Sequence, residues 1–260
     1  MEINYSENIR ENMRPFTELS NIRLNSSAWR WLRGKATLFA SFDAPAVGWE
    51  NLATIKYDAF TRTETSQLAD EARIATQVLA NSLAVRTPAL DLATVPFGEI
   101  SYLTEISPGK SSATGRELPR RQDAFGTAGI VTRGAGFLRE AKLGIQARQN
   151  LAYAGKSVEP GGRLGLTLGH NFGPLDVSFA GQVDGFLPAA TDDATDIGVW
   201  TAFDLSAKLP LGGGLALRAG VEGIAIRGKV PSTDGFGVVF APLVGVTYGA
   251  TWKPISGVIY

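Results

Sequence analysis

Charged residues placed at every second position are the feature of this sequence that could do chemistry. In several segments they alternate one by one with apolar residues. Successive side chains of an extended strand point to opposite faces, so this spacing gathers the charges on one face. A charged face that encloses water can select small polar solutes. We therefore expect a set of pore-lining residues: Arg148, Arg163, Asp176, Asp184, Asp196, Asp204, Arg218 and Glu222.

The structural alternative for these charges is that they pair and fill the enclosed space. Buried charges must be paired, and a narrow barrel has an interior that side chains can fill. On this alternative no single member of the set contacts a solute. The sequence leaves both interpretations open.

The single histidine offers no recognisable catalytic arrangement. A hydrolase serine needs a base beside it, and His170 has no serine two residues away. The parity of His170 matches that of Leu166 and Leu168, which places it on an apolar face. One histidine and no cysteine exclude a multi-histidine or thiolate metal site. We therefore expect no catalytic residue, no metal and no cofactor, in a protein that is not an enzyme.

The alternating segments are long and their connections alternate in length. They span 139–151, 163–171, 175–186, 196–209 and 214–226. Soluble strands average about 5–6 residues, whereas a strand that crosses a bilayer at a tilt needs roughly 9–11. Connections at 152–162, 185–195 and 227–235 are long, while those at 171–174 and 210–214 are tight. Short periplasmic turns and long external loops are typical of outer-membrane barrels.

The first half of the chain extends this pattern. Residues 69–83 fit a helix, which would plug the lumen, as well as they fit a strand. The total is about twelve strands, with ten or eight as alternatives. The expected fold is all-β: an up-and-down antiparallel transmembrane β-barrel over 19–260, after a polar leader at 1–18. Its earlier strands are expected at 19–27, 30–43, 49–62, 74–88 and 95–106, with short turns at 44–48 and 134–136 and a long loop at 107–125.

Aromatic residues fall near the expected strand ends, where a membrane protein concentrates them. We expect Trp49, Tyr248, Trp252 and Tyr260 at the membrane interfaces. Tyr260 is also the last residue, and Trp252 shares its parity. In its alternating strands, loop lengths and terminal aromatic residue, the chain resembles the bacterial outer-membrane β-barrel superfamily over roughly residues 30–260, and no single family is indicated. Pro254 and Ser256 depart from the apolar positions usual there.

The resemblance implies a place in the outer membrane of a Gram-negative bacterium. It implies contact with the lipid bilayer and lipopolysaccharide, and with the assembly machinery that recognises a terminal aromatic residue. The N-terminus is polar and contains no signal peptide, so we expect that one has been removed. The long loops offer surface for partner proteins. Lys and Arg total 25 against 25 Asp and Glu, a balance that excludes nucleic acid as a partner.

Three functions remain from the sequence. The first is a porin-like channel for small polar solutes, which the charged face favours. The second is a structural or assembly barrel with a sealed lumen that contacts partner proteins. The third is an outer-membrane lipid hydrolase, which the missing His/Ser pair disfavours. A soluble β-sandwich or ligand-binding barrel is the alternative fold.

Overall fold

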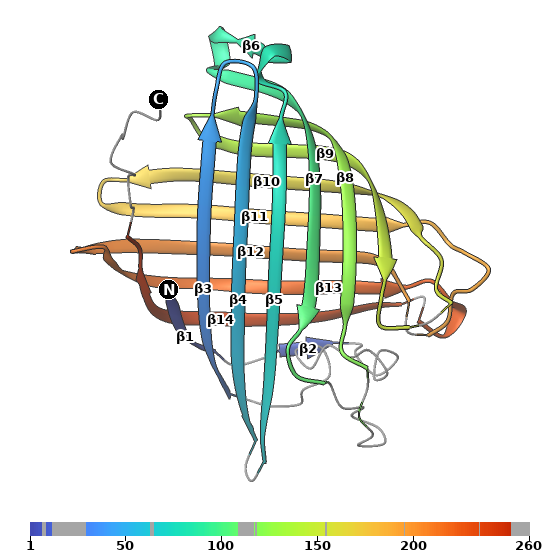
Figure 1. The fold of residues 1–260 in the computed structure, drawn as a ribbon. Coiled ribbons are helices and arrows are strands. Elements are labelled where there is room, and N and C mark those ends of the chain that lie inside the picture. The colour runs from blue at the N-terminus through green and yellow to red at the C-terminus, as the bar shows by residue number, and fades with distance from the viewer. Residues whose placement is uncertain are drawn as a thin grey trace, which may run out of the picture.

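The computed structural model describes residues 1–260 except 7–8, 12–29, 63–64, 109–116, 118, 154, 195, 234 and 251–260. Its long strands form one antiparallel sheet that closes into a twelve-stranded barrel (Figure 1). The expected fold class is therefore confirmed. The wall consists of β1 (Glu2–Ser6) and β2 (Ile9–Glu11), which share one place, β3 (Arg30–Asp43), β4 (Gly48–Arg62), β5 (Thr65–Leu79), β7 (Leu92–Glu105), β8 (Gln122–Gly134), β9 (Leu138–Asn150), β10 (Glu159–Phe172), β11 (Leu175–Phe186), β12 (Ile197–Gly212), β13 (Leu215–Gly228) and β14 (Phe236–Tyr248).

The N-terminal residues close the barrel. Strand β1 pairs with β14 on one side, where Glu2 lies opposite Thr247, and with β3 on the other, where Glu2 lies opposite Lys35. Strand β2 pairs with β14 further along. Closure pairs the edges that would otherwise be left with free backbone groups. This part of the expected polar leader thus belongs to the barrel wall, while the strand expected at 19–27 lies outside the described residues.

The two ends of the barrel differ in the length of their connections. The turn end carries short connections at 44–47, 135–137, 173–174 and 213–214. The loop end carries longer ones at 106–121, 151–158, 187–196 and 229–235. Met1 and Tyr248 both lie at the turn end, where the terminal ammonium donates a 2.7 Å hydrogen bond to the Tyr248 carbonyl. The alternation of loop lengths in the second half was therefore predicted correctly.

Two connections break this alternation. Strands β4 and β5 are joined at the loop end by two residues, since Arg62 and Thr65 pair. Residues 80–91 then connect β5 to β7 at the turn end, and they include the short strand β6 (Val85–Thr87). The strand expected at 74–88 therefore had wrong bounds. The helical interpretation of 69–83 was also wrong, because Ala75, Gln77 and Leu79 are buried while Ile74 and Val78 are exposed, which is the period of a strand.

The outer face of the wall is apolar and the inner face is charged. Leu38, Ile100 and Ile145 are 76%, 75% and 75% exposed on the outside. In the described part of the chain, apolar residues also cluster inside: Leu79, Phe97 and Val131 form one cluster, and Ile197, Ile226 and Val239 form another. None of the described helices is long and apolar enough to cross a membrane.

Candidate functional site in the barrel interior

A buried carboxylate holds the middle of the interior together. Glu99, 8% exposed, accepts hydrogen bonds from Lys142 and Arg163 at 3.0 Å each, and from Arg73 at 3.4 Å. Arg163 also donates to Asp184 at 2.7 Å. These side chains come from β5, β7, β9, β10 and β11. Because one acid meets three cations, the cluster links strands that are not neighbours in the wall.

Further ion pairs extend toward both ends. At the turn end Arg133 reaches across from β8 to Glu50 on β4 at 2.5 Å and also holds Glu140 at 3.0 Å. Along β13, Arg218 contacts Asp204, Glu222 at 3.4 Å and Glu2 at 3.0 Å. Ion pairs between non-adjacent strands narrow the lumen. This is the arrangement expected if the charges pair with one another and fill the enclosed space.

A cluster of acids at the loop end is already neutralised by basic side chains. Carboxylate oxygens of Glu159, Asp192 and Asp196 lie within 4.8 Å of one another. The Lys229 ammonium contacts Glu159 at 3.0 Å and Asp192 at 3.1 Å, while Lys156 contacts Asp196 at 2.6 Å. Burial lowers the pKa of Lys156, but its hydrogen bonds to Asp196 and Asp193 outweigh burial and hold the pKa above its usual value. The cluster therefore ties the loops 151–158, 187–196 and 229–235 together.

Among the residues that the structure describes, two cavities lie between the ion pairs. The loop-end chamber, about 440 Å³, lies between β3–β5 and β11–β14. The turn-end chamber measures about 260 Å³ and extends past Phe39, Glu50 and Arg133. Leu52, Arg73, Arg163, Gly181 and Gln182 line both chambers. These shared residues form the partition between the two.

The inner face of β3 is the open side of the lumen. Lys35 lines the loop-end chamber and Phe39, on the same face, lines the turn-end chamber. Thr37 lies between them and is exposed, as is Phe39 at 61%. By contrast Arg163 and Arg218 across the lumen are 4% and 2% exposed. The loop-end chamber therefore extends from β3 and β4 across to the strands that carry the expected pore residues.

The structure gathers most of the eight expected pore-lining residues but buries several. Five line the loop-end chamber: Arg148, Arg163, Asp184, Asp204 and Glu222. Arg218 lies behind it, Asp176 pairs with Arg139 near the turn end, and Asp196 precedes β12 in the loop cluster. That these residues contact a solute stays a prediction.

Sequence reasoning missed the first-half members of this site. They are Lys35, Lys56, Glu71, Arg73 and Glu99. The alternation of residues 30–43 and 49–62 could have identified Lys35 and Lys56, since both have the parity of the polar face. Glu71 and Arg73 were not identified because residues 69–83 fit a helix as well as a strand, so the direction of their side chains was not defined.

Exposed aromatic residues collect at the turn end. Trp49 and Tyr248 are 49% and 47% exposed there, together with Phe42 at 61%. Trp252 and Tyr260 lie outside the described residues. The interfacial role of these aromatic residues stays a prediction.

His170 lies on the outer face at the turn end. It is exposed, and its ring packs edge-on against Phe172 with centroids 4.6 Å apart. Its partner across the sheet is Val177, while Ser178 next to it forms its hydrogen bond inside the barrel with Ser206. Within the described part of the chain no hydroxyl or carboxylate is bonded to His170.

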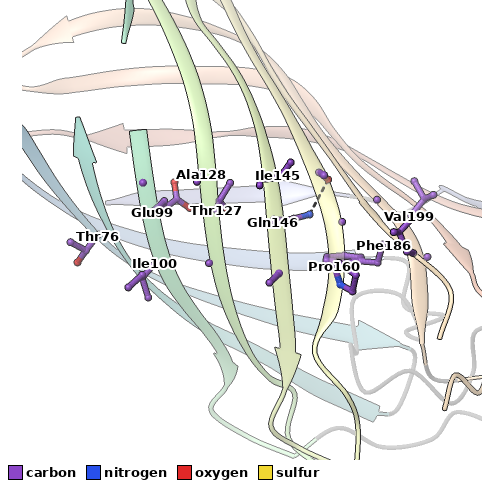
Figure 2. A pocket seen from close by; sticks show the side chains of 18 of the residues that line it. Thr76, Glu99, Ile100, Thr127, Ala128, Ile145, Gln146, Pro160, Phe186 and Val199 are labelled. Carbon is purple, nitrogen blue, oxygen red and sulfur yellow. Dashed lines mark hydrogen bonds between the residues drawn. The ribbon is translucent and has the colours of Figure 1, made fainter. Parts of the chain in front are cut away.

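The outer wall carries a separate groove of about 1140 Å³ (Figure 2). Gly98, Gly126 and Ala128 form its floor, and Ile100 and Ile145 project from neighbouring strands beside them. The groove lies on the face that an outer-membrane barrel turns toward lipid. It is therefore no part of the interior site.

Comparisons with known proteins support the fold. No family model matches the chain, and neither does any curated protein. Among solved structures, outer membrane phospholipase A from Escherichia coli and an active-site mutant of it each match with 11% identity and a TM-score of 0.52, covering 94% of this chain and 88% of theirs. The Salmonella typhi phospholipase dimer with bound calcium matches with 10% identity, the same TM-score and the same coverage. At this identity the likeness shows the fold alone, a closed antiparallel β-barrel like those of these outer-membrane proteins.

The prediction that the chain is not an enzyme is contradicted by this likeness, because the solved structures that share its fold are those of a phospholipase. Catalytic side chains can come together from separate strands. The missing His/Ser spacing was therefore too weak a ground for excluding catalysis.

Proposed function

We propose that this outer-membrane-type barrel is a narrow channel for small polar solutes. Its path runs along the inner face of β3 and β4, from the loop-end chamber past Thr37 and Thr54 to the turn-end chamber. The observation that carries the proposal is the exposure of Thr37 and Phe39 inside the barrel, opposite a side filled by ion pairs. Polar groups and paired charges along such a path set which solutes pass.

Accessibility of position 37 tests the path directly. The natural chain has no cysteine, so Thr37→Cys introduces the only thiol. We expect the variant to conduct in planar bilayers and to lose most of its current when a bulky, charged thiol reagent is added. The reagent would attach where the solute passes.

Leu38→Cys is the matched control. Leu38 is the next residue on the same strand and is 76% exposed on the outer face, where hydrocarbon excludes a charged reagent. The current through the Leu38→Cys variant should not change when the reagent is added. A wild-type barrel that inserts without conducting would contradict the channel and favour the sealed structural or assembly barrel.

A lipid hydrolase is the second candidate, favoured by the likeness to phospholipases. His170 is the one histidine available as a base. If the chain hydrolyses phospholipid through it, purified protein in detergent should release fatty acid, and His170→Ala should abolish the release. Release that survives in His170→Ala would exclude a histidine-based mechanism, and no release from wild type would remove the candidate.

A further inference from the structure

The groove on the outer wall has a floor of small residues. They belong to five neighbouring strands, β7 to β11, and they are Gly98, Gly126, Ala128, Ala147, Gly162 and Gly185. Neighbouring strands lie about 4.8 Å apart, so the floor is roughly 19 Å long. Ile100 and Ile145 are both 75% exposed and project beside it (Figure 2). The groove is therefore a long apolar depression in the surface that such a barrel turns toward lipid.

A polar pair lies at the β5 end of this groove. Thr76, which lines the groove, donates a 3.0 Å hydrogen bond to Oδ1 of Asn51 on β4. Asn51 has the parity of Ile55, which is 54% exposed on the outer face, and Thr76 has that of Ile74, which is 60% exposed there. In the described part of the chain, no acceptor is bonded to Nδ2 of Asn51. An amide that faces hydrocarbon with unused N–H groups is unfavourable, so an acceptor from the surroundings would stabilise it.

The depth of Asn51 suits the carbonyl groups of a phospholipid. Trp49 is two residues closer to the turn end on the same face, and we expect it at the level of the headgroups. At about 3.3 Å per residue and a strand tilt near 40°, Asn51 lies roughly 5 Å deeper. A phospholipid has its ester carbonyls at this boundary, and its acyl chains continue into the hydrocarbon. The groove runs the same way, from Thr76 near the turn end of β5 to Pro160 at the loop end of β10.

We propose that the groove binds a phospholipid of the leaflet at the turn end. This rests on the place of the barrel in a membrane and not on conduction. The ester carbonyl accepts a hydrogen bond from Nδ2 of Asn51, and the acyl chain lies over the floor between Ile100 and Ile145. Hydrocarbon surrounds the whole wall, so the chain gains no hydrophobic free energy by entering the groove. Retention comes instead from close packing over glycine and alanine and from the hydrogen bond, the two terms that drive association inside membranes.

Retention of two matched lipids tests the hydrogen bond. A diacyl phosphatidylcholine has ester carbonyls, whereas its dialkyl ether analogue has the same headgroup and chain length but no carbonyl. The full-length barrel is reconstituted with an equimolar mixture of the two, transferred to detergent and measured by native mass spectrometry. We expect about one retained lipid per barrel, with the diacyl form about fivefold in excess, as for one net hydrogen bond. Asn51→Leu should bring this ratio to about one.

Filling the groove tests the acyl-chain site. A Cβ at Gly98 or Gly126 meets nothing within 4 Å, so Gly98→Leu/Gly126→Leu should fold and lose the retained lipid of either kind. Gly34→Leu is the matched control. Gly34 lies on the outer face of β3 outside the groove, and a Cβ there meets only the Tyr57 carbonyl oxygen, at 3.9 Å. This variant should retain lipid as the wild type does.

Migration of unheated protein on a detergent gel verifies that each variant is folded. Wild type that retains no lipid, or a filled groove that retains as much as wild type, would overturn the lipid site. Equal retention of the diacyl and dialkyl forms, or a ratio unchanged in Asn51→Leu, would overturn the hydrogen bond and with it the proposal. None of these outcomes bears on the current measured with Thr37→Cys. A chain that stays in solution without detergent would contradict the membrane location itself.

Discussion

At the scale of single residues, Glu99 shows how the barrel tolerates charge in its interior. The carboxylate is buried and accepts hydrogen bonds from Lys142, Arg163 and Arg73. Placing charges in an environment poor in water is unfavourable, and pairing offsets this only when every partner is present. The interior therefore depends on Glu99 more than on an acid at its rim.

Substitution of this carboxylate tests that dependence. We expect Glu99→Ala to lower the free energy of unfolding by about 3–5 kcal/mol, because it leaves buried cations with fewer partners. Urea titration in detergent, followed by tryptophan fluorescence, measures the loss.

Glu140→Ala is the control at this scale. The Glu140 side chain is 34% exposed and its partner Arg133 keeps Glu50, so the loss should be no more than about 1 kcal/mol. Equal losses in both variants would show that the Glu99 cluster contributes no more than a surface ion pair.

At the scale of elements, the turns of the second half follow directly from local chemistry. Gly212, Gly213 and Gly214 have φ of +97°, +59° and +82°, values at which residues with a Cβ are strained. Gly214 is also close to the end of β14, since a Cβ there would lie 2.4 Å from the Gly249 carbonyl oxygen. The turn between β12 and β13 thus needs glycine for two separate reasons.

We expect Gly214→Ala to destabilise the barrel by about 1–3 kcal/mol, because both the backbone angle and the close contact oppose a methyl group. On a detergent gel, the folded barrel and the unfolded chain migrate as different bands. The heating temperature at which the folded band disappears measures this effect. Gly136→Ala, in a turn at the same end where a Cβ meets nothing within 4 Å, should leave that temperature nearly unchanged. If Gly136→Ala lowers this temperature as much as Gly214→Ala does, any substitution in a turn has this effect.

The elements of the first half were harder to predict for a physical reason. Strand β5 contains Ala69, Ala72 and Ala75 among polar residues, and these residues fit a helix as readily as a strand. The backbone pairing of β5 with β4 and β7 decides its structure. Such pairing joins residues far apart in sequence and overrides local preference.

At the scale of the whole molecule, closure determines both the fold and the available space. Apolar clusters and ion pairs fill part of the interior. The loop-end chamber remains between β3–β5 and β11–β14, and the turn-end chamber extends past Phe39, Glu50 and Arg133. A channel for small solutes and a lipid-active barrel share this fold, so the thiol and hydrolysis experiments must decide between them.

The sequence by itself determined the class of fold, the orientation of the two faces and the unequal ends of the barrel. Each follows from short-range rules: alternation along a strand, the length needed to cross a bilayer and the backbone angles of glycine turns. Only the tertiary structure decided that residues 2–6 close the barrel, that Glu99 joins three cations and that a chamber remains between β3–β5 and β11–β14. Those features depend on which strands become neighbours, and the periodicity of a single strand carries no information about its neighbours.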